Sequence, residues 1–106
     1  MPAVSLRDVY EYDPMPAGLD PVERPHVLGA QCNMWTEYVT TPRQLQQMVF
    51  PRMCAFAEAV WCTRRDPFET FEKRLATHVE RLQALDIDVF RPRGSHAWRR
   101  RTTEAL

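Results

Sequence analysis

The sequence has no apolar run that approaches the roughly 20 residues a membrane-spanning helix needs. Its first residues, Met-Pro-Ala-Val-Ser, lack the basic cluster and apolar core of a signal peptide. It also lacks an excess of charge, because 14 Lys and Arg residues balance 14 Asp and Glu residues. A dedicated nucleic-acid-binding protein is usually basic. We therefore expect no membrane span, no signal peptide in this chain and no nucleic-acid partner.

Cysteine is scarce as well: the chain has Cys32, Cys54 and Cys62, and no Cys-x-x-Cys pair. An odd number of cysteines in apolar surroundings favours buried free thiols in a reducing compartment, which slightly favours the cytoplasm. The three histidines show no zinc-ligand spacing with these cysteines. We predict no metal site and no cofactor.

What is present suits a globular chain, with 44% apolar and 26% charged residues. Its 106 residues make one small domain or part of a larger one. The first helix signal is Ser5, an N-cap candidate with Asp8 three residues later, and this helix should end before Pro14. Residues 14–25 contain four prolines and are typical of a loop.

The segment 27–34 is short and mostly apolar, without clean alternation of apolar and polar residues. That pattern is typical of a strand covered on both faces in a parallel sheet. A lone parallel strand has no partner to bond to, and its open edges would be sticky. The chain is therefore predicted to be part of a larger domain.

Two consecutive helices are predicted next. Thr40 or Thr41 caps the first, Pro42 takes its first position, and Pro51 breaks it and starts the second. The second helix is apolar nearly all round, which is typical of a buried helix. We expect Arg52 and Glu58 to have a buried ion-pair or hydrogen-bonding role rather than a chemical one. The residues predicted to lie in the core are Met53, Phe56 and Trp61.

The strongest helix start is Asp66-Pro67-Phe68-Glu69, with Asp as the expected cap. It precedes an amphipathic helix of about 20 residues. Its apolar face is built from Phe68, Phe71, Leu75, Val79, Leu82 and Leu85. A short extended segment is expected at 87–90. The end of the chain, residues 93–106, is predicted to be a basic tail, usually a solvated feature.

Several of these segments resemble glycoside hydrolase family 20, the β-N-acetylhexosaminidases. The resemblance lies in the apolar run that leads into Trp35-Thr36-Glu37, in the helix start Phe50-Pro51-Arg52 and in the helix end Ala57-Glu58 with Trp61. It implies an α/β fold: the C-terminal part of a (β/α)8 TIM barrel, mostly helical, with one short core strand at about 27–34. Residues 1–92 would form this last portion of the catalytic barrel.

The resemblance also implies an activity. Family 20 enzymes remove terminal β-linked N-acetylglucosamine or N-acetylgalactosamine with retention of configuration, and the substrate's own acetamido group is the nucleophile. The family's catalytic Asp-Glu pair follows the fourth strand, and nothing in this chain matches it. We therefore expect no catalytic residue here, and a fragment that is inactive alone without the N-terminal part of the barrel.

The positions that the resemblance does cover are Trp35 and Glu37. Active sites of TIM barrels lie at the C-terminal ends of the strands, where this pair falls. By resemblance, Trp35 lines the sugar and its acetamide pocket, and Glu37 accepts hydrogen bonds from the 4- and 6-hydroxyls of an N-acetylhexosamine-terminated glycan. Asn33 and Tyr38 could touch the rim of this subsite or simply pack.

Two readings other than an enzyme fragment stay open. The chain could be a small non-catalytic helical module that binds a partner through exposed apolar faces. It could also be an inactive gene remnant. Cooperative unfolding of a stable monomer would favour the interaction module, whereas an upstream coding sequence for the Asp-Glu strand would favour the enzyme.

Overall fold

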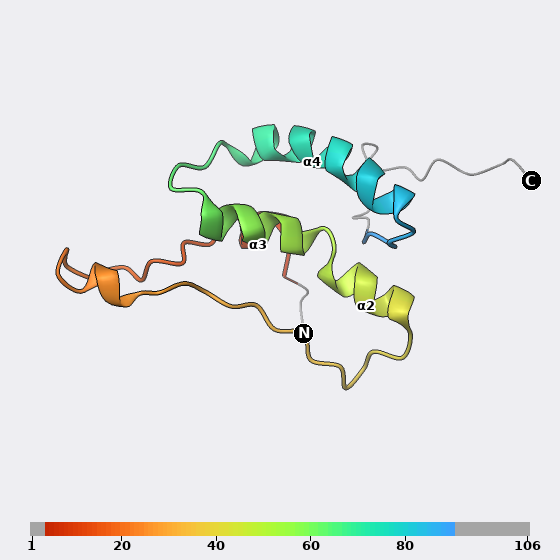
Figure 1. The fold of residues 1–106 in the computed structure, drawn as a ribbon, viewed down its shortest axis with the longest axis horizontal. Helices are drawn as coiled ribbons and strands as arrows, with labels where there is room; N and C mark the ends of the chain where they lie inside the picture. Colours follow the sequence, from red (N-terminus) through yellow and green to blue (C-terminus); the bar gives the residue numbers. More distant parts are fainter. Residues whose placement is uncertain (1–3, 91–106) are drawn as a thin grey trace, which may run out of the picture.

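The computed structural model describes residues 4–90, so the predicted basic tail 93–106 lies outside the described residues. These residues form four α-helices and one short 3-10 helix. The α-helices are α1 (Leu6–Glu11), α2 (Pro42–Val49), α3 (Arg52–Trp61) and α4 (Phe68–Ala84), and the 3-10 helix is η1 (Arg24–His26). In Figure 1, α3 lies at the centre with α4 along one side, while the chain between α1 and α2 forms a long open loop.

Helix α1 begins as the sequence predicts. The Ser5 hydroxyl accepts a hydrogen bond from the Asp8 amide at 3.0 Å, and the Asp8 carboxylate accepts one from the Ser5 amide at 3.2 Å. This reciprocal capping box satisfies two amide groups that have no partner inside the helix. Hydrogen bonding to the Asp8 carboxylate from the Ser5 side chain, and then from the Ser5 backbone amide, holds the pKa of Asp8 below its usual value.

The proline signals in the middle of the chain are also confirmed. Thr41 is the N-cap of α2, with its hydroxyl accepting from the Gln44 amide at 3.1 Å, and Pro42 is the first helical residue. Helix α2 ends at Val49, one residue before the cis Phe50–Pro51 bond, and α3 starts at Arg52. Proline has no amide hydrogen to donate, so the two helices cannot merge across residue 51.

The predicted cap of α4 is wrong. Pro67 occupies the N-cap position without a side-chain hydrogen bond, and the helix begins at Phe68. Asp66 instead accepts from Arg74 through its carboxylate and from the Tyr10 hydroxyl through its backbone carbonyl. These tertiary partners hold Asp66 away from the helix terminus. The helix has 17 residues, somewhat fewer than expected.

The C-terminal end of α4 is a Schellman motif. Asp86 has φ 60°, its amide donates to the Gln83 carbonyl at 2.9 Å, and the Ile87 amide donates to the Leu82 carbonyl at 3.0 Å. These two bonds satisfy carbonyls that the helix leaves free. The chain then turns back, and the Phe90 amide donates to the Phe50 carbonyl at 3.0 Å.

The core lies where α1, α3 and α4 meet. The Tyr10 ring stacks on the Phe71 ring with centroids 4.4 Å apart, and both side chains are buried. The predicted apolar face of α4 is largely confirmed, although Phe68 is half-buried and Leu85 is exposed. The buried apolar residues are Tyr10, Ala55, Ala59, Phe71, Leu75, Val79, Leu82 and Val89.

The predicted strand at 27–34 is not found in the structure. No residue between 4 and 90 is in a strand, and within that range the backbone of 28–35 has no hydrogen-bonding partner. A β-ladder needs a neighbouring extended segment to exchange N–H and C=O hydrogen bonds. The described chain supplies no such neighbour, and Leu28 is 96% exposed.

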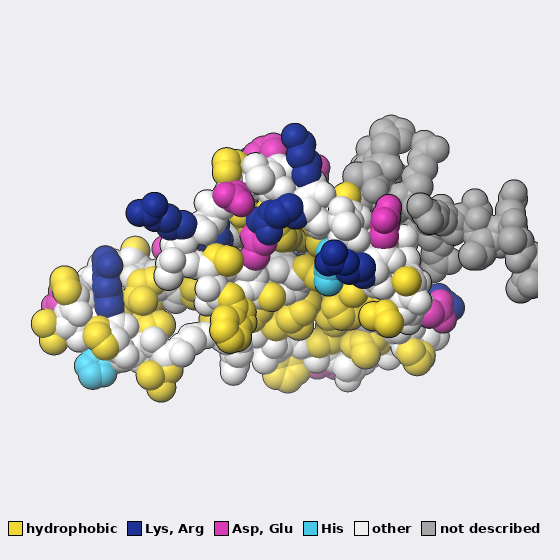
Figure 2. All heavy atoms as spheres, turned by 45° about the horizontal axis from the view of Figure 1, so that its top comes forward, with side chains coloured by type: hydrophobic (Ala, Val, Ile, Leu, Met, Phe, Trp, Pro, Cys, Tyr) yellow, Lys and Arg dark blue, Asp and Glu magenta, His cyan; other side chains and the backbone are white. Residues whose placement is uncertain are grey.

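The prediction of a wholly buried α3 is also wrong. Ala55 and Ala59 are buried, but Trp61 is 86% exposed, Met53 is exposed and Phe56 is half-buried. Only one face of α3 packs against helices of the described chain. Figure 2 shows apolar side chains gathered along one side of the molecule, with charged side chains above them.

Candidate functional site

Trp35 and Glu37 lie in the loop between the extended segment and α2. Residues Thr36 to Val39 form a turn, closed by a hydrogen bond from the Val39 amide to the Thr36 carbonyl at 3.1 Å. Glu37 and Tyr38 occupy the middle of this turn, so their side chains project from the chain. Trp35 is 72% exposed and Tyr38 is 88% exposed. The structure thus presents an indole and a carboxylate close together in sequence on an open surface.

The loop is attached to the first turn of α2. The Gln44 side-chain oxygen accepts from the Thr40 amide at 2.9 Å and from the Thr40 hydroxyl at 3.1 Å. Gln44 is the third helical residue, the position from which a side chain reaches back to the chain before the helix. Thr41 completes the junction as N-cap.

On the other side of Trp35, residues 31–34 border a groove of about 390 Å³. The Cys32 sulfur lies 3.7 Å from the Met53 sulfur of α3, and Met34 is half-buried. Asn33, a candidate for the subsite rim, faces this groove. Contacts along it attach the chain before Trp35 to the helices. Its walls include Val9, Tyr12, Met48, Val49 and Phe56.

Arg52 lies in the same groove and has a structural role, as expected. Its guanidinium donates to the backbone carbonyls of Met48 and of Val4, the latter at 3.2 Å. These bonds satisfy a free carbonyl near the end of α2 and connect it to the chain before α1. Arg52 is half-buried, and this burial lowers its pKa from the ordinary value.

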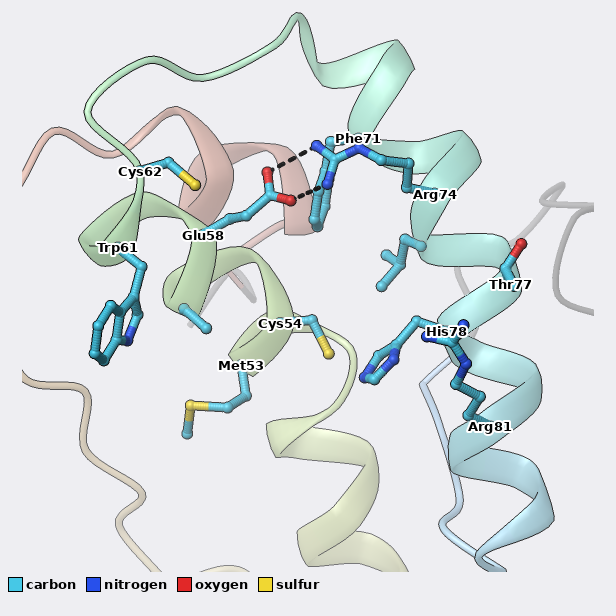
Figure 3. A pocket seen from close by; sticks show the side chains of 12 residues that line it. Met53, Cys54, Glu58, Trp61, Cys62, Phe71, Arg74, Thr77, His78 and Arg81 are labelled. Carbon is cyan, nitrogen blue, oxygen red and sulfur yellow. Dashed lines mark hydrogen bonds and ion pairs between the residues drawn. The ribbon is translucent and has the colours of Figure 1, made fainter.

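A second and larger groove, of about 770 Å³, runs between α3 and α4 (Figure 3). The Glu58 carboxylate at its rim accepts from both terminal nitrogens of Arg74, so the expected ion-pair role of Glu58 is confirmed. Glu58 is half-buried rather than buried. Because both oxygens of this carboxylate accept from Arg74, we assign Glu58 a structural role rather than a chemical one.

The thiols do not form a site either. Cys54 lines the α3–α4 groove, and burial raises the pKa of its thiol, which disfavours the reactive thiolate. All three cysteines are free, but Cys32 and Cys62 are exposed, so the prediction of buried thiols is wrong for these two. Among residues 4–90 no group of three or more His, Cys, Asp or Glu side chains could hold a metal ion.

Within the same range, no helix combines the length and the apolar character required to cross a membrane. Several carboxylates outside the Glu37 loop take part in ion pairs or hydrogen bonds. Glu11 binds Arg7 at 2.9 Å, Asp86 lies 3.6 Å from Arg43, and Asp88 accepts from Gln47 at 2.7 Å. Glu37 differs from these carboxylates, because it is exposed and follows the exposed Trp35 in the same loop.

Comparisons with a family model and with individual known proteins agree with each other. Residues 1–64 match the family described as "Glycosyl hydrolase family 20, catalytic domain". A β-hexosaminidase of Porphyromonas gingivalis is 35% identical over 88 residues, which cover 82% of this chain and 11% of that protein.

Two further relatives show the same relationship. A β-N-acetylhexosaminidase of Cellulomonas fimi is 33% identical over 72% of this chain and 15% of its own length. A β-hexosaminidase of Akkermansia muciniphila is 30% identical over 90% of this chain and 20% of its own length. The chain thus spans a fifth or less of these relatives, while the similarity covers most of the chain itself.

Proposed function

The chain belongs to glycosyl hydrolase family 20, and from this premise we propose that it forms one wall of the sugar pocket of a β-N-acetylhexosaminidase. The family is one of glycoside hydrolases, and its catalytic domain is a TIM barrel, so the substrate class is a glycan. The observation that carries the proposal is the exposed Trp35 followed by the exposed turn residue Glu37. In a TIM barrel, loops that follow the strands build the active site.

Each of the two side chains suits a sugar. A flat indole offers an apolar surface to the axial C–H groups of a pyranose and to the methyl of an acetamide. An ionised carboxylate accepts hydrogen bonds from hydroxyls more strongly than a neutral group does. We therefore assign Trp35 to the sugar face and acetamide, and Glu37 to the 4- and 6-hydroxyls of a terminal N-acetylhexosamine.

The chemical step in this proposal is retaining and substrate-assisted. The acetamido oxygen of the substrate attacks the anomeric carbon, while an Asp orients the acetamide and a Glu protonates the leaving oxygen. We place that Asp-Glu pair outside these 106 residues, in the part of the barrel that must pack on the extended segment 27–34. Support comes from the backbone of 28–35, which has no hydrogen-bonding partner within residues 4–90, and from the exposed Leu28.

Kinetics on a full-length family 20 enzyme that carries this segment tests the role of Glu37. Glu37→Gln keeps the shape but removes the charge, and should lower kcat/KM on an aryl N-acetylglucosaminide roughly 10- to 100-fold. Glu80→Gln, an exposed α4 carboxylate, is the matched control and should leave kcat/KM unchanged. Equal effects of the two substitutions would remove Glu37 from the site.

The 106-residue chain alone provides the complementary test. It should not hydrolyse a chromogenic N-acetylglucosaminide, because the acid and the acetamide-orienting group are absent from it. Robust turnover by the purified chain would contradict the proposal.

A second candidate function is a non-catalytic helical module that binds a partner protein. It is favoured by the exposed apolar side chains Leu28, Tyr38 and Trp61. This candidate requires the chain to fold as a stable monomer. Cooperative unfolding with a concentration-independent midpoint would support it, whereas a non-cooperative transition would favour the barrel segment.

A further inference from the structure

We propose that Gln44 is a positioning residue: its side-chain oxygen fixes the loop that presents Glu37 to the sugar. The inference rests on the proposed role of Glu37 in binding the 4- and 6-hydroxyls. It adds a residue that does not touch the sugar and acts through Thr40, three residues beyond Glu37. The structural basis is the pair of hydrogen bonds between the Thr40 amide and hydroxyl and the Gln44 side chain.

The two hydrogen bonds hold both the backbone and the side chain of Thr40. The Thr40 amide donates to Gln44 Oε1 at 2.9 Å, which fixes the backbone, and the Thr40 hydroxyl donates to the same atom at 3.1 Å, which fixes the side chain. Gln44 is itself held, because its amide donates to the Thr41 hydroxyl at 3.1 Å and it belongs to the first turn of α2. The anchor is therefore part of a helix rather than of another loop.

No other hydrogen bond ties the Glu37 loop to the rest of the described chain. Among residues 4–90, the segment 35–40 has one internal bond, from the Val39 amide to the Thr36 carbonyl, and the two bonds to Gln44. Glu37 and Tyr38 are exposed, whereas Val39 at the end of the turn is half-buried. Within residues 4–90, the Thr40–Gln44 contact is therefore the hydrogen-bonded anchor of the turn.

This dependence has a consequence for sugar binding. A hydroxyl-to-carboxylate bond requires an O···O distance of about 2.5–3.0 Å and weakens steeply when the angle deteriorates. Binding groups have to be held within about 0.5 Å of their productive positions. Without the hydrogen bonds to Gln44, the loop still carries Glu37, but the Glu37 carboxylate occupies its productive position for less of the time.

The test compares two substrates in a full-length family 20 enzyme that carries this segment. One substrate is an aryl N-acetylglucosaminide, and the other is its 4,6-dideoxy analogue, which lacks the hydroxyls assigned to Glu37. Gln44→Ala should lower kcat/KM about tenfold for the first substrate and less than about twofold for the second. A general loss of folded enzyme lowers both equally and leaves the ratio between the substrates unchanged.

Two further substitutions sharpen the test. Gln44→Glu keeps an acceptor oxygen for Thr40 and should retain the substrate preference to within about threefold. Gln47→Ala removes another glutamine of α2, whose side chain donates to Asp88, and should leave the preference unchanged. If the substrate preference is retained in Gln44→Glu and in Gln47→Ala but lost in Gln44→Ala, the Thr40 contact is the cause.

The outcomes separate this inference from the proposed function. Glu37→Gln must abolish most of the preference for the hydroxylated substrate; if it does not, the assignment of Glu37 fails. If Glu37→Gln abolishes the preference but Gln44→Ala leaves it intact, the positioning role of Gln44 is overturned while the role of Glu37 stands. Loss of the preference in Gln44→Ala with recovery in Gln44→Glu supports the inference.

Discussion

Glu58 of α3 and Arg74 of α4 form a two-point ion pair across the larger groove. The Glu58 carboxylate accepts from both terminal nitrogens of Arg74, with 3.0 Å between Arg74 Nη2 and Glu58 Oε2 (Figure 3). Arg74 Nη2 also lies 3.4 Å from the Asp66 carboxylate. The hydrogen bond to Glu58 raises the pKa of Arg74 above its ordinary value. The pair therefore connects the two longest helices, α3 and α4, across the groove that lies between them.

This pair should contribute measurably to stability. The side chain of Glu58 is 20% exposed and that of Arg74 is 51% exposed, so solvent screens part of the attraction. A double-mutant cycle with Glu58→Gln and Arg74→Met is expected to give a coupling energy of about 1 kcal/mol in urea unfolding of a full-length family 20 enzyme that carries this segment. The exposed Arg7–Glu69 pair, at 3.5 Å, is the matched control and should give a coupling near zero. Equal couplings would show that the second hydrogen bond adds nothing.

Tyr10 should be the most sensitive single position in the core. Its hydroxyl donates to the Asp66 carbonyl and its ring stacks on Phe71 in a site that is 2% exposed. Tyr10→Phe keeps the ring and should cost about 1 kcal/mol of unfolding free energy. Tyr10→Ala leaves a cavity and should cost about 3–5 kcal/mol. If both substitutions cost the same, ring packing is not what this site provides.

The same residue makes the stability fall at alkaline pH. Desolvation by burial, the largest cause, raises the pKa of Tyr10 in the folded state above its ordinary value. The folded chain thus retains a proton that the unfolded chain loses above about pH 10, so stability falls as pH rises from there through the folded pKa. Wild type should therefore lose its stability advantage over Tyr10→Phe in that range. A pH-independent difference between the two would contradict the assignment.

The three thiols should differ in reactivity. Cys54 is half-buried on α3 and burial raises its pKa, whereas Cys32 and Cys62 are exposed. Only the thiolate attacks an alkylating agent. Cys54 is therefore less accessible to the reagent, and a smaller fraction of its thiol is ionised. At pH 8, mass spectrometry of iodoacetamide-treated chain should show Cys32 and Cys62 modified several times faster than Cys54. In urea all three rates should converge, which separates the effect of the fold from that of local sequence.

Helix boundaries were the part of the fold most readable from sequence. The Ser5–Asp8 box, the Thr41 cap with Pro42, and the interruption at Pro51 all depend on residues within a few positions of one another. Local rules of this kind need no distant partner. The cap at Asp66 failed because Tyr10 and Arg74, far away in sequence, bind that residue instead.

The residues of the candidate site were predictable from the sequence, but the hydrogen bonds that hold its loop were not. The resemblance to family 20 pointed to Trp35 and Glu37, and that assignment stays a prediction until kinetics tests it. The anchor between Thr40 and Gln44 was missed, although a capping position followed by glutamine at the third helical residue is a recognisable signal.

The sequence by itself determined the family and the places where helices start and stop, since both are written in short motifs and local hydrogen bonds. Tertiary structure decided which apolar residues outside α4 are buried. Ala55 and Ala59 are buried, since α1 packs on α3 and Ala55 shares an apolar cluster with Phe71 of α4, whereas Trp61 is exposed and the strand-like segment 27–34 is unpaired within residues 4–90. Burial and strand pairing depend on what lies opposite, and residues 4–90 provide neither a second strand beside 27–34 nor a cover for Trp61.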